Sequence, residues 1–223
     1  MINRNKNIEL LNIDKDFDKS LNIIKRMYIN GNIFIYPTDT IYCIGANPFN
    51  LIAVNKIQKI IRQNSISEST LMVDNLYNLS NYIDISSEKH FDLLFSVWPN
   101  PVRIIFKLNP QYQELFGTSK AAFQIPNNRF CLRLLDEIKS PLLSIRLNDI
   151  SNTTCKSYEI LKDDYSNYVD AFFYTQKEFF NLDTALIDLT NDEPIILRKN
   201  KINLDNIFNK YQNQISTKRT FTF

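Results

Sequence analysis

The chain alternates short, continuous apolar runs with longer segments in which apolar residues recur every three or four positions. The most pronounced run, IFIY at residues 33–36, is aromatic and β-branched throughout. Such a run is typical of a strand buried on both faces. Pro37 follows and ends the hydrogen-bonded ladder, because proline has no N–H to donate. Thr38, Asp39 and Thr40 come next, before a second apolar run over residues 41–44. The pattern predicts two strands joined by a polar turn.

Apolar residues at helical spacing predict amphipathic helices between the strands. The first helix is expected to start at a cap formed by Asp14 or Asp16 and to run to about Asn30. Asn50 is expected to cap the second helix, whose apolar positions extend to Ile61. Further helices are predicted at residues 76–82, 87–97, 131–138 and 156–165.

The remaining apolar runs have strand character, with β-branched or aromatic residues bounded by turn residues. They lie at residues 70–73, 102–108, 121–125, 141–145, 169–174, 185–189 and 194–197. Strands alternating with helices, without an internal repeat or a linker, predict one mixed α/β domain. We expect this domain to cover residues 1–199 and a polar C-terminal tail to cover residues 200–223.

The composition is that of an ordinary soluble globular chain, with 44% hydrophobic and 22% charged residues. A net charge of +2 gives no global attraction to nucleic acid. No apolar run approaches ~20 residues and no secretory h-region is present, so we expect no membrane association and a cytoplasmic location. Scattered cysteines fit reduced thiols. A single histidine, His90, expected at the surface, argues with them against zinc.

The polar residues after the first predicted strand are the main candidate for a binding site. The ends of buried strands are where open α/β sheets usually bind their ligands. Thr38, Asp39 and Thr40 offer a hydroxyl, a carboxylate and a second hydroxyl at such an end. The alternative is a polar hairpin turn in which the threonines only cap the strands.

The residues of this segment resemble a known family signature. YPTDTIY at residues 36–42, followed by Gly45, is similar to the motif of the YrdC/YciO family, whose best-known members are the threonylcarbamoyl-AMP synthases of tRNA modification. The resemblance extends over roughly residues 21–199. It implies one YrdC-like domain with a twisted mixed open sheet, flanking helices and a concave groove. The other matching blocks are TLMV at 70–73, WPNP at 98–101, PLLS at 141–144, LIDLT at 186–190 and IILR at 195–198.

The resemblance implies that threonine, bicarbonate and ATP are joined into threonylcarbamoyl-AMP and pyrophosphate. The carbamate of threonine is itself the nucleophile, so the protein needs positioning and cations rather than a catalytic side chain, and none is assigned. Arg62, Arg198 and a magnesium ion would neutralise the triphosphate. The substrate-binding residues that the resemblance implies are Thr38, Asp39, Thr40, Tyr42 and Thr184.

The sequence also departs from the family pattern at charged positions. Arg103 stands where the family has a threonine, Gln124 where it has an arginine, and Arg146 where it has a serine. Without a gap, one cation, Arg62, replaces the family's Lys-x-Arg pair; with a one-residue deletion it matches the Ile-Arg-Gln of YciO-type members. These changes predict synthase activity that is reduced, with Arg103 and Arg146 as sources of charge from new positions.

A second function stays open beside the synthase. Concave grooves of this family are associated with double-stranded RNA or tRNA binding, and Arg103, Arg129 and Arg146 are the candidate contacts to RNA or to phosphate. A third reading is a decayed paralogue held in a complex by its surface. For the synthase we expect Thr38, Thr40, Arg62 and Thr184 to open into one groove.

Overall fold

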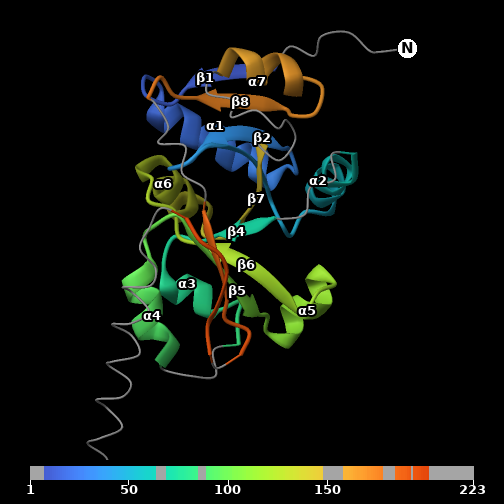
Figure 1. Cartoon of the computed structure of the whole chain (residues 1–223). Coiled ribbons are helices and arrows are strands. Elements are labelled where there is room, and N and C mark those ends of the chain that lie inside the picture. The colour runs from blue at the N-terminus through green and yellow to red at the C-terminus, as the bar shows by residue number, and fades with distance from the viewer. Residues whose placement is uncertain are drawn as a thin grey trace, which may run out of the picture.

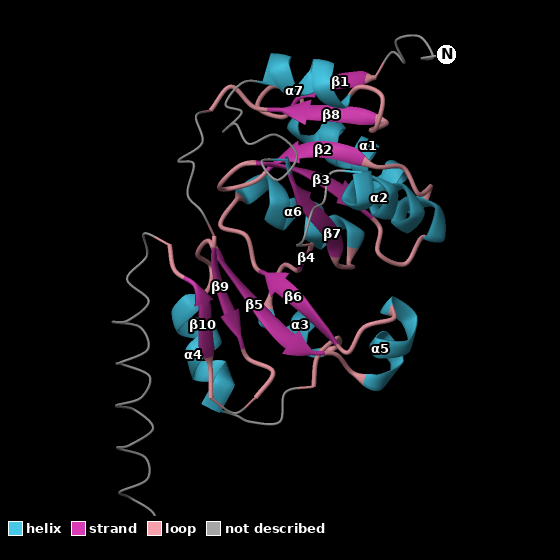
Figure 2. Ribbon diagram, turned by 45° about the vertical axis from the view of Figure 1, so that its right-hand side comes forward, coloured by secondary structure: helices cyan, strands magenta, loops and turns pink. Residues whose placement is uncertain are grey.

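The computed structural model describes residues 8–63, 69–84, 89–147, 158–177, 184–191 and 193–200. Within these residues, ten strands form one mixed sheet in the order β1-β8-β2-β3-β7-β4-β6-β5-β9-β10. Figures 1 and 2 show that the strand direction changes strongly from the β1 end of the sheet to the β10 end. The strands are β1 (Glu9–Asn12), β2 (Phe34–Pro37), β3 (Tyr42–Ala46), β4 (Thr70–Met72), β5 (Val102–Lys107), β6 (Lys120–Gln124), β7 (Leu142–Arg146), β8 (Ala171–Tyr174), β9 (Ala185–Asp188) and β10 (Ile195–Arg198).

The half of the sheet that contains β2 is covered on both faces. Helices α1 (Phe17–Ile29) and α6 (Arg129–Ile138) pack on one face and share a core with Phe34 and Tyr36. Helices α2 (Leu51–Gln63) and α7 (Tyr158–Tyr165) belong to the core that contains Ile35 on the other face. Because side chains alternate along a strand, β2 serves both cores, which confirms the two-sided burial expected from the sequence.

The other half of the sheet, from β4 to β10, has its core on one face. Helices α3 (Leu76–Ser80) and α4 (Lys89–Val97) pack there against Val102 and Ile104 of β5. In Figure 2 these two helices lie behind strands β5 and β9, whose front face is turned to the viewer. Within the described residues no helix packs on that front face, although side chains that point to it, such as those of Thr70 and Arg103, are buried.

The sequence predicted the strands and helices of this sheet within a few residues, except two elements. Strand β1 was not expected, and it pairs in parallel with β8, a strand more than 150 residues later in the chain. Helix α5 (Pro110–Phe116) was also not expected. None of its residues is buried, and its aromatic side chains instead contact a distant residue, with the rings of Phe116 and Phe49 at 5.6 Å. Both elements depend on contacts that no local pattern reveals.

Two buried residues lie at the α4 end of this core. Trp98 belongs to the core, and its indole N–H donates to the carbonyl of Val102 at 2.7 Å. His90 is buried, which corrects the expectation of a surface position. It lies three and four residues before Leu93 and Leu94 on α4, and this spacing puts all three on the inner side of the helix.

The predicted boundary between the domain and a C-terminal tail stays a prediction, because residues 201–223 lie outside the described part of the chain. The described residues do continue through β10 to Asn200, whose side-chain amide donates to the carbonyl of Pro101 at 3.0 Å. Among the helices of the described residues, none has the length and apolar character needed to cross a bilayer.

Gly45 is expected to be intolerant of a side chain. A Cβ at this position would lie 2.7 Å from Cε2 of Phe34 and 2.9 Å from Cε1 of Tyr36, and both rings are fully buried. Gly45→Ala should therefore lower the free energy of unfolding by about 1–3 kcal/mol through overpacking. Urea denaturation of the variant and the wild type measures this difference.

Gly117→Asn is the control. A Cβ at Gly117 has no atom within 4 Å, and its φ of +65° is one that asparagine tolerates. Its effect should stay within about 0.5 kcal/mol. If both variants lose equal stability, the close approach at Gly45 is not the cause.

Candidate functional site

The turn between β2 and β3 is held together by the side chain of Thr38. Its hydroxyl donates to the carbonyl of Ile41 at 2.6 Å and accepts from the backbone N–H groups of Thr40 and Ile41, each at 3.2 Å. The N–H of Thr38 donates to the same carbonyl at 3.0 Å. The hydroxyl is thus engaged in forming the turn, and the hydroxyl of Thr40 lies 3.4 Å from it. Thr38 shapes the loop more directly than it offers a free group to a ligand.

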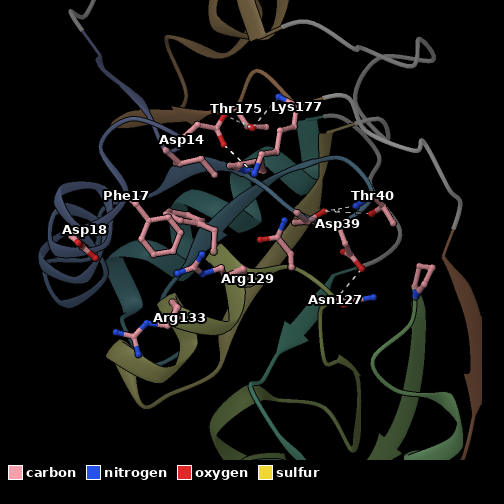
Figure 3. A pocket seen from close by; sticks show the side chains of 16 residues that line it. Asp14, Phe17, Asp18, Asp39, Thr40, Asn127, Arg129, Arg133, Thr175 and Lys177 are labelled. Carbon is pink, nitrogen blue, oxygen red and sulfur yellow. Dashed lines mark hydrogen bonds and ion pairs between the residues drawn. The ribbon is translucent and has the colours of Figure 1, made fainter.

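This turn borders a cleft of about 1020 Å³. Figure 3 shows the cleft between the turn at Asp39 and Thr40 and the side chains of Phe17 and Arg129, which come from α1 and α6. The cleft is large enough for a nucleotide-sized ligand. The residues that line it are Ile13, Asp14, Phe17, Asp18, Pro37, Thr38, Asp39, Thr40, Pro101, Asn127, Asn128, Arg129, Phe130, Arg133, Thr175 and Lys177.

Asp39 is the half-buried carboxylate of the cleft. One oxygen, Oδ2, accepts from the backbone N–H of Asn127 at 3.2 Å, a contact that Figure 3 shows as a dashed line. The other oxygen, Oδ1, is shielded from water and has no hydrogen-bond partner. Burial raises the pKa of this carboxyl above its usual value, and the Asn127 hydrogen bond offsets only part of the rise. Asp39 is thus an incompletely satisfied carboxylate at the border of the cleft.

Tyr42 faces away from the turn and fixes a neighbouring segment. Its phenol donates to the carbonyl of Thr175 at 3.3 Å and accepts from the N–H of Thr175 at 3.1 Å. The hydroxyl of Thr175 in turn donates to the carboxylate of Asp14 at 2.7 Å, and Lys177 lies 3.6 Å from the same carboxylate. Tyr42 therefore holds one wall of the cleft in position, and no contact aims it at a ligand.

The end of the cleft between α1 and α6 carries cations that already have protein contacts. The guanidinium carbon of Arg129 lies 5.5 Å from the centre of the Phe17 ring, within the range of a cation–π contact. Arg133 pairs with Asp136 at 3.2 Å and with Glu137 at 3.4 Å. The ion pairs of Arg133 are exposed and contribute little to stability, and the ring of Phe17 leaves the charge of Arg129 in place.

A second polar group surrounds Thr184, which is 2% exposed. The Nη1 atom of Arg146 donates to the Thr184 hydroxyl at 3.5 Å, and the Nη2 atom of Arg198 donates to the same oxygen at 3.4 Å. The Nε atom of Arg198 also donates to the Thr184 carbonyl at 3.0 Å. The next residue, Ala185, donates to the carbonyl of Pro101 at 2.9 Å, and Pro101 lines the cleft. The group is thus next to the cleft wall.

The candidate RNA contacts do not form one exposed cationic surface. Arg103 is 2% exposed, and its Nη1 atom donates to the hydroxyl of Thr70 at 3.3 Å. A side chain buried to this extent offers no surface to a duplex, which corrects its proposed RNA contact. Arg129 lies on Phe17 and Arg146 lies on Thr184, at separate parts of the fold.

The predicted common groove is realised in part. Thr38 and Thr40 line the cleft, and Thr184 lies next to its Pro101 wall. Arg62 is exposed in the last turn of α2 and is not among the residues that line the cleft. Its neighbours at residues 64–68 lie outside the described part of the chain.

Sequence reasoning did not identify most of the residues that line the cleft opposite the β2–β3 turn. Asp14, Phe17, Thr175 and Lys177 lie at element ends that become neighbours only through the β1–β8 pairing. Asn127 follows the predicted strand and precedes Asn128, whose side chain caps α6 by accepting from Cys131 at 3.0 Å. That capping signal predicts a helix start, but not its contact with Asp39.

The possible metal ligands of the cleft fit a magnesium ion bound to a nucleotide better than a metal ion held by the protein alone. Among the described residues, no three His, Cys, Asp or Glu side chains gather as a metal cage. Magnesium commonly keeps several waters and is held by one or two carboxylates together with substrate phosphates. The carboxylates that line the cleft are those of Asp14, Asp18 and Asp39.

Comparisons with known proteins agree on one family. A sequence model for Sua5, YciO and YrdC proteins, described as "Telomere recombination", matches residues 26–200. The threonylcarbamoyl-AMP synthase of Pseudoalteromonas atlantica is 28% identical over 64% of this chain and 78% of its own length.

Solved structures share the fold. Escherichia coli YciO superposes with a TM-score of 0.77 at 22% identity, over 91% of this chain and 99% of that one. Sua5 of P. abyssi, solved with L-threonine, superposes with a TM-score of 0.78 at 18% identity, over 92% of this chain and 60% of that one. The fold that the sequence resemblance implied is confirmed. This chain belongs to the Sua5/YciO/YrdC family.

Proposed function

We propose that the protein is a threonylcarbamoyl-AMP synthase, acting in tRNA threonylcarbamoyladenosine modification. The observation that carries the proposal is the cleft bordered by Thr38, Asp39 and Thr40, with the arginine-bound Thr184 beside its wall. A synthase relative at 28% identity and the threonine complex of Sua5 support the substrate class. The substrates proposed are threonine, bicarbonate and ATP.

The reaction needs no nucleophilic side chain. Threonine and bicarbonate give a carbamate with loss of water, and a carbamate oxygen attacks the α-phosphorus of ATP. The bond from that phosphorus to the β-phosphate oxygen breaks, and pyrophosphate leaves. The protein's part is to hold the carbamate in line and to neutralise the phosphates.

The threonine end is assigned to the β2–β3 turn. Thr38 fixes the turn through its three hydroxyl contacts, and Thr40 and Asp39 present polar atoms to the amino acid. The free Oδ1 of Asp39 suits an N–H of threonine, because a shielded acceptor without a donor is costly. Thr184 is the further substrate contact proposed, and Tyr42 acts by holding the Thr175 wall.

The phosphate end is assigned to Arg198, to the magnesium ion that ATP carries and to Arg62. The assignment of Arg62 rests on the sequence resemblance alone, because this residue does not line the cleft. A bound magnesium ion would spread the charge of the phosphates and help pyrophosphate to leave. Arg198 is oriented by its two contacts to Thr184.

The direct test is pyrophosphate release by the full chain. We expect release that requires threonine, bicarbonate, ATP and magnesium together. Arg62→Ala should lower this rate by about 10²–10³, the scale for removing one group that stabilises charge in a transition state. The rate is measured with a coupled pyrophosphate assay.

Lys59→Ala is the matched control, because Lys59 is an exposed cation one turn earlier on the same helix. Its rate should equal that of the wild type. Pyrophosphate release that continues without threonine, or no release from a folded sample, contradicts the proposal. Equal losses of rate in Arg62→Ala and Lys59→Ala would mean that the rate depends on the total positive charge of α2 and not on Arg62 itself.

Asp39→Asn separates stability from binding. Because the pKa of this carboxyl is raised in the fold, its ionised form destabilises the folded state. That penalty is absent below the unfolded pKa of ~3.9 and fully present above the folded pKa. The variant should therefore unfold at a higher temperature than the wild type near pH 7, with a difference that shrinks as the pH falls. Thermal unfolding as a function of pH measures this.

The same variant should bind threonine about tenfold more weakly, since a charge-assisted hydrogen bond becomes a neutral one. Calorimetry with L-threonine measures the affinity. Glu114→Gln, on the exposed side of α5, is the control and should change neither quantity. A loss of stability in Asp39→Asn at neutral pH would show that the ionised carboxylate is satisfied in the fold.

A further inference from the structure

Large apolar side chains are exposed together on one side of the molecule. They come from the end of α1, from the start of α2 and from α5, and Figures 1 and 2 both show α2 and α5 on the side away from α4. Leu51 is 78% exposed, Ile29 64%, Ile52 62% and Leu115 57%. Single apolar residues on a surface are ordinary, whereas a contiguous group of them commonly marks an interaction site.

The segment that precedes α2 joins the three helices. The side-chain amide of Asn50 donates to the carbonyl of Ile29 at 3.4 Å, so the end of α1 lies beside the start of α2. The rings of Phe49 and Phe116 are stacked with their centres 5.6 Å apart, so α5 packs on the same segment. We name the contiguous surface formed in this way the apolar patch; it consists of Ile29, Phe49, Leu51, Ile52 and Leu115.

Helix α5 is the least complete part of the packing at this patch. It has seven residues, and none of them is buried. The rings of Tyr112 and Phe116 contact Phe49, but Leu115 beside them projects into solvent. A helix this short is not stable by itself in water and depends on tertiary packing. An apolar partner over Leu115 would therefore complete the packing of α5.

The patch lies at the opposite end of α1 from the cleft. Phe17, which lines the cleft, is the first residue of α1, and Ile29 is the last. At a rise of 1.5 Å per residue these two are about 18 Å apart along the helix. Phe49 likewise follows the end of β3 that is remote from the β2–β3 turn. A partner on the patch would leave the cleft open, so the patch is separate from the site described above.

The polar groups beside the patch are suited to pairing with copies of themselves. Asn30, Asn55 and Gln111 are exposed next to it, and an amide side chain both donates and accepts hydrogen bonds. Lys56 lies one turn after Ile52, and its charge is balanced by Asp170 of the same chain at 3.0 Å. Two identical copies of this surface can therefore meet without strong repulsion, as interface cores that are depleted of charge do.

Exposed charges of opposite sign stand at the two ends of the patch. Arg26 lies one turn before Ile29 on α1, and Glu114 precedes Leu115 on α5. Within the described residues neither of them forms an ion pair. In a two-fold dimer, groups on one side of the axis contact groups on the other side in the partner. Arg26 would then face the partner's Glu114, a pair that contributes to orientation more than to stability.

We propose that the apolar patch is the interface of a two-fold dimer of this chain, in which α5 of each copy covers the start of α2 of the other. Five side chains exposed to this extent give an apolar area on the order of 500 Å². With its polar surroundings the patch approaches the ~800 Å² per partner that specific interfaces bury, at the lower end of the range. The dimer is therefore expected to exchange with the monomer at a Kd on the order of micromolar.

The test is sedimentation equilibrium of the full chain over concentrations from about 1 to 100 μM, which bracket that Kd. Leu51→Glu and Leu115→Lys should each weaken dimerisation at least tenfold, because each would bury unpaired charges at the interface. Phe95→Glu is the matched control, because Phe95 is 72% exposed but lies on α4, outside the patch. It should dimerise as the wild type does.

An equimolar mixture of Leu51→Glu and Leu115→Lys tests which helices meet. In the mixed dimer, one of the two equivalent contacts brings the introduced carboxylate to the introduced ammonium group, and the other keeps both leucines. The mixed dimer should therefore form at least tenfold more tightly than either variant forms a dimer alone. Both substituted positions are largely exposed, so both variants should fold, which circular dichroism and thermal unfolding verify.

The outcomes separate a specific interface from general stickiness. A wild-type chain that stays monomeric up to about 100 μM overturns the proposal, since this exceeds the expected Kd. A dimer that the patch variants leave unchanged, or that Phe95→Glu weakens equally, overturns it as well. A mixture that stays monomeric overturns the contact between α2 and α5. None of these results depends on whether the protein makes the adenylate, so the dimer and the proposed function can fail separately.

Discussion

The hydrogen bonds of the Thr38 hydroxyl are the constraint on which the cleft depends. Pro37, the last residue of β2, supplies no N–H, and the backbone continues across the turn through one bond, from the Thr38 N–H to the Ile41 carbonyl. The Thr38 hydroxyl adds three more contacts, by accepting from two backbone N–H groups and donating to the same carbonyl. With the turn fixed in this way, the carboxylate of Asp39 accepts from the N–H of Asn127, and its other oxygen has no hydrogen-bond partner.

The position of the site follows from how the sheet is covered. Between β1 and β7, helices pack on both faces. Between β4 and β10 the helices of the described residues pack on one face. The β2–β3 turn is joined to this second half by the contact of Asp39 with Asn127, which follows β6, and it shares the cleft with Pro101, which precedes β5.

The fold was predictable from the sequence where the signal is local. The two-sided burial of β2 follows from an unbroken apolar run, and the helix cap at Asn50 follows from a side chain that accepts from nearby backbone N–H groups. The side-chain cap expected at Asp14 or Asp16 does not form: Asp16 is the N-cap residue of α1, but its side chain makes no cap hydrogen bond. Strand β1 and helix α5 were not predictable, because β1 is stabilised by pairing with β8 and α5 by an aromatic contact with Phe49.

The candidate site, too, was predictable only where the signal is local in the sequence. The Thr38–Thr40 turn was predictable because hydroxyl, carboxylate and hydroxyl directly follow a buried strand. The role of Thr38 in closing the turn agrees with the hairpin alternative that the sequence left open, whereas its particular partner, the carbonyl of Ile41, depends on the geometry of the turn. The burial of Arg103 was also out of reach, because the face to which a strand residue points depends on register. The contact of Tyr42 with Thr175 joins residues 133 positions apart.

The register between β5 and β6 also shows how an arginine on one strand can stand near the position of the family's arginine on the other. In the β5–β6 ladder Ile104 pairs with Phe123, so Arg103 and Gln124 are the next residues along the two neighbouring strands. The sequence resemblance assigns the family's arginine to position 124 and its threonine to position 103. Opposite side chains on neighbouring strands lie about 5 Å apart at Cβ, which is less than the length of an arginine side chain. Arg103 therefore lies within reach of the part of the sheet where the resemblance places the family's arginine.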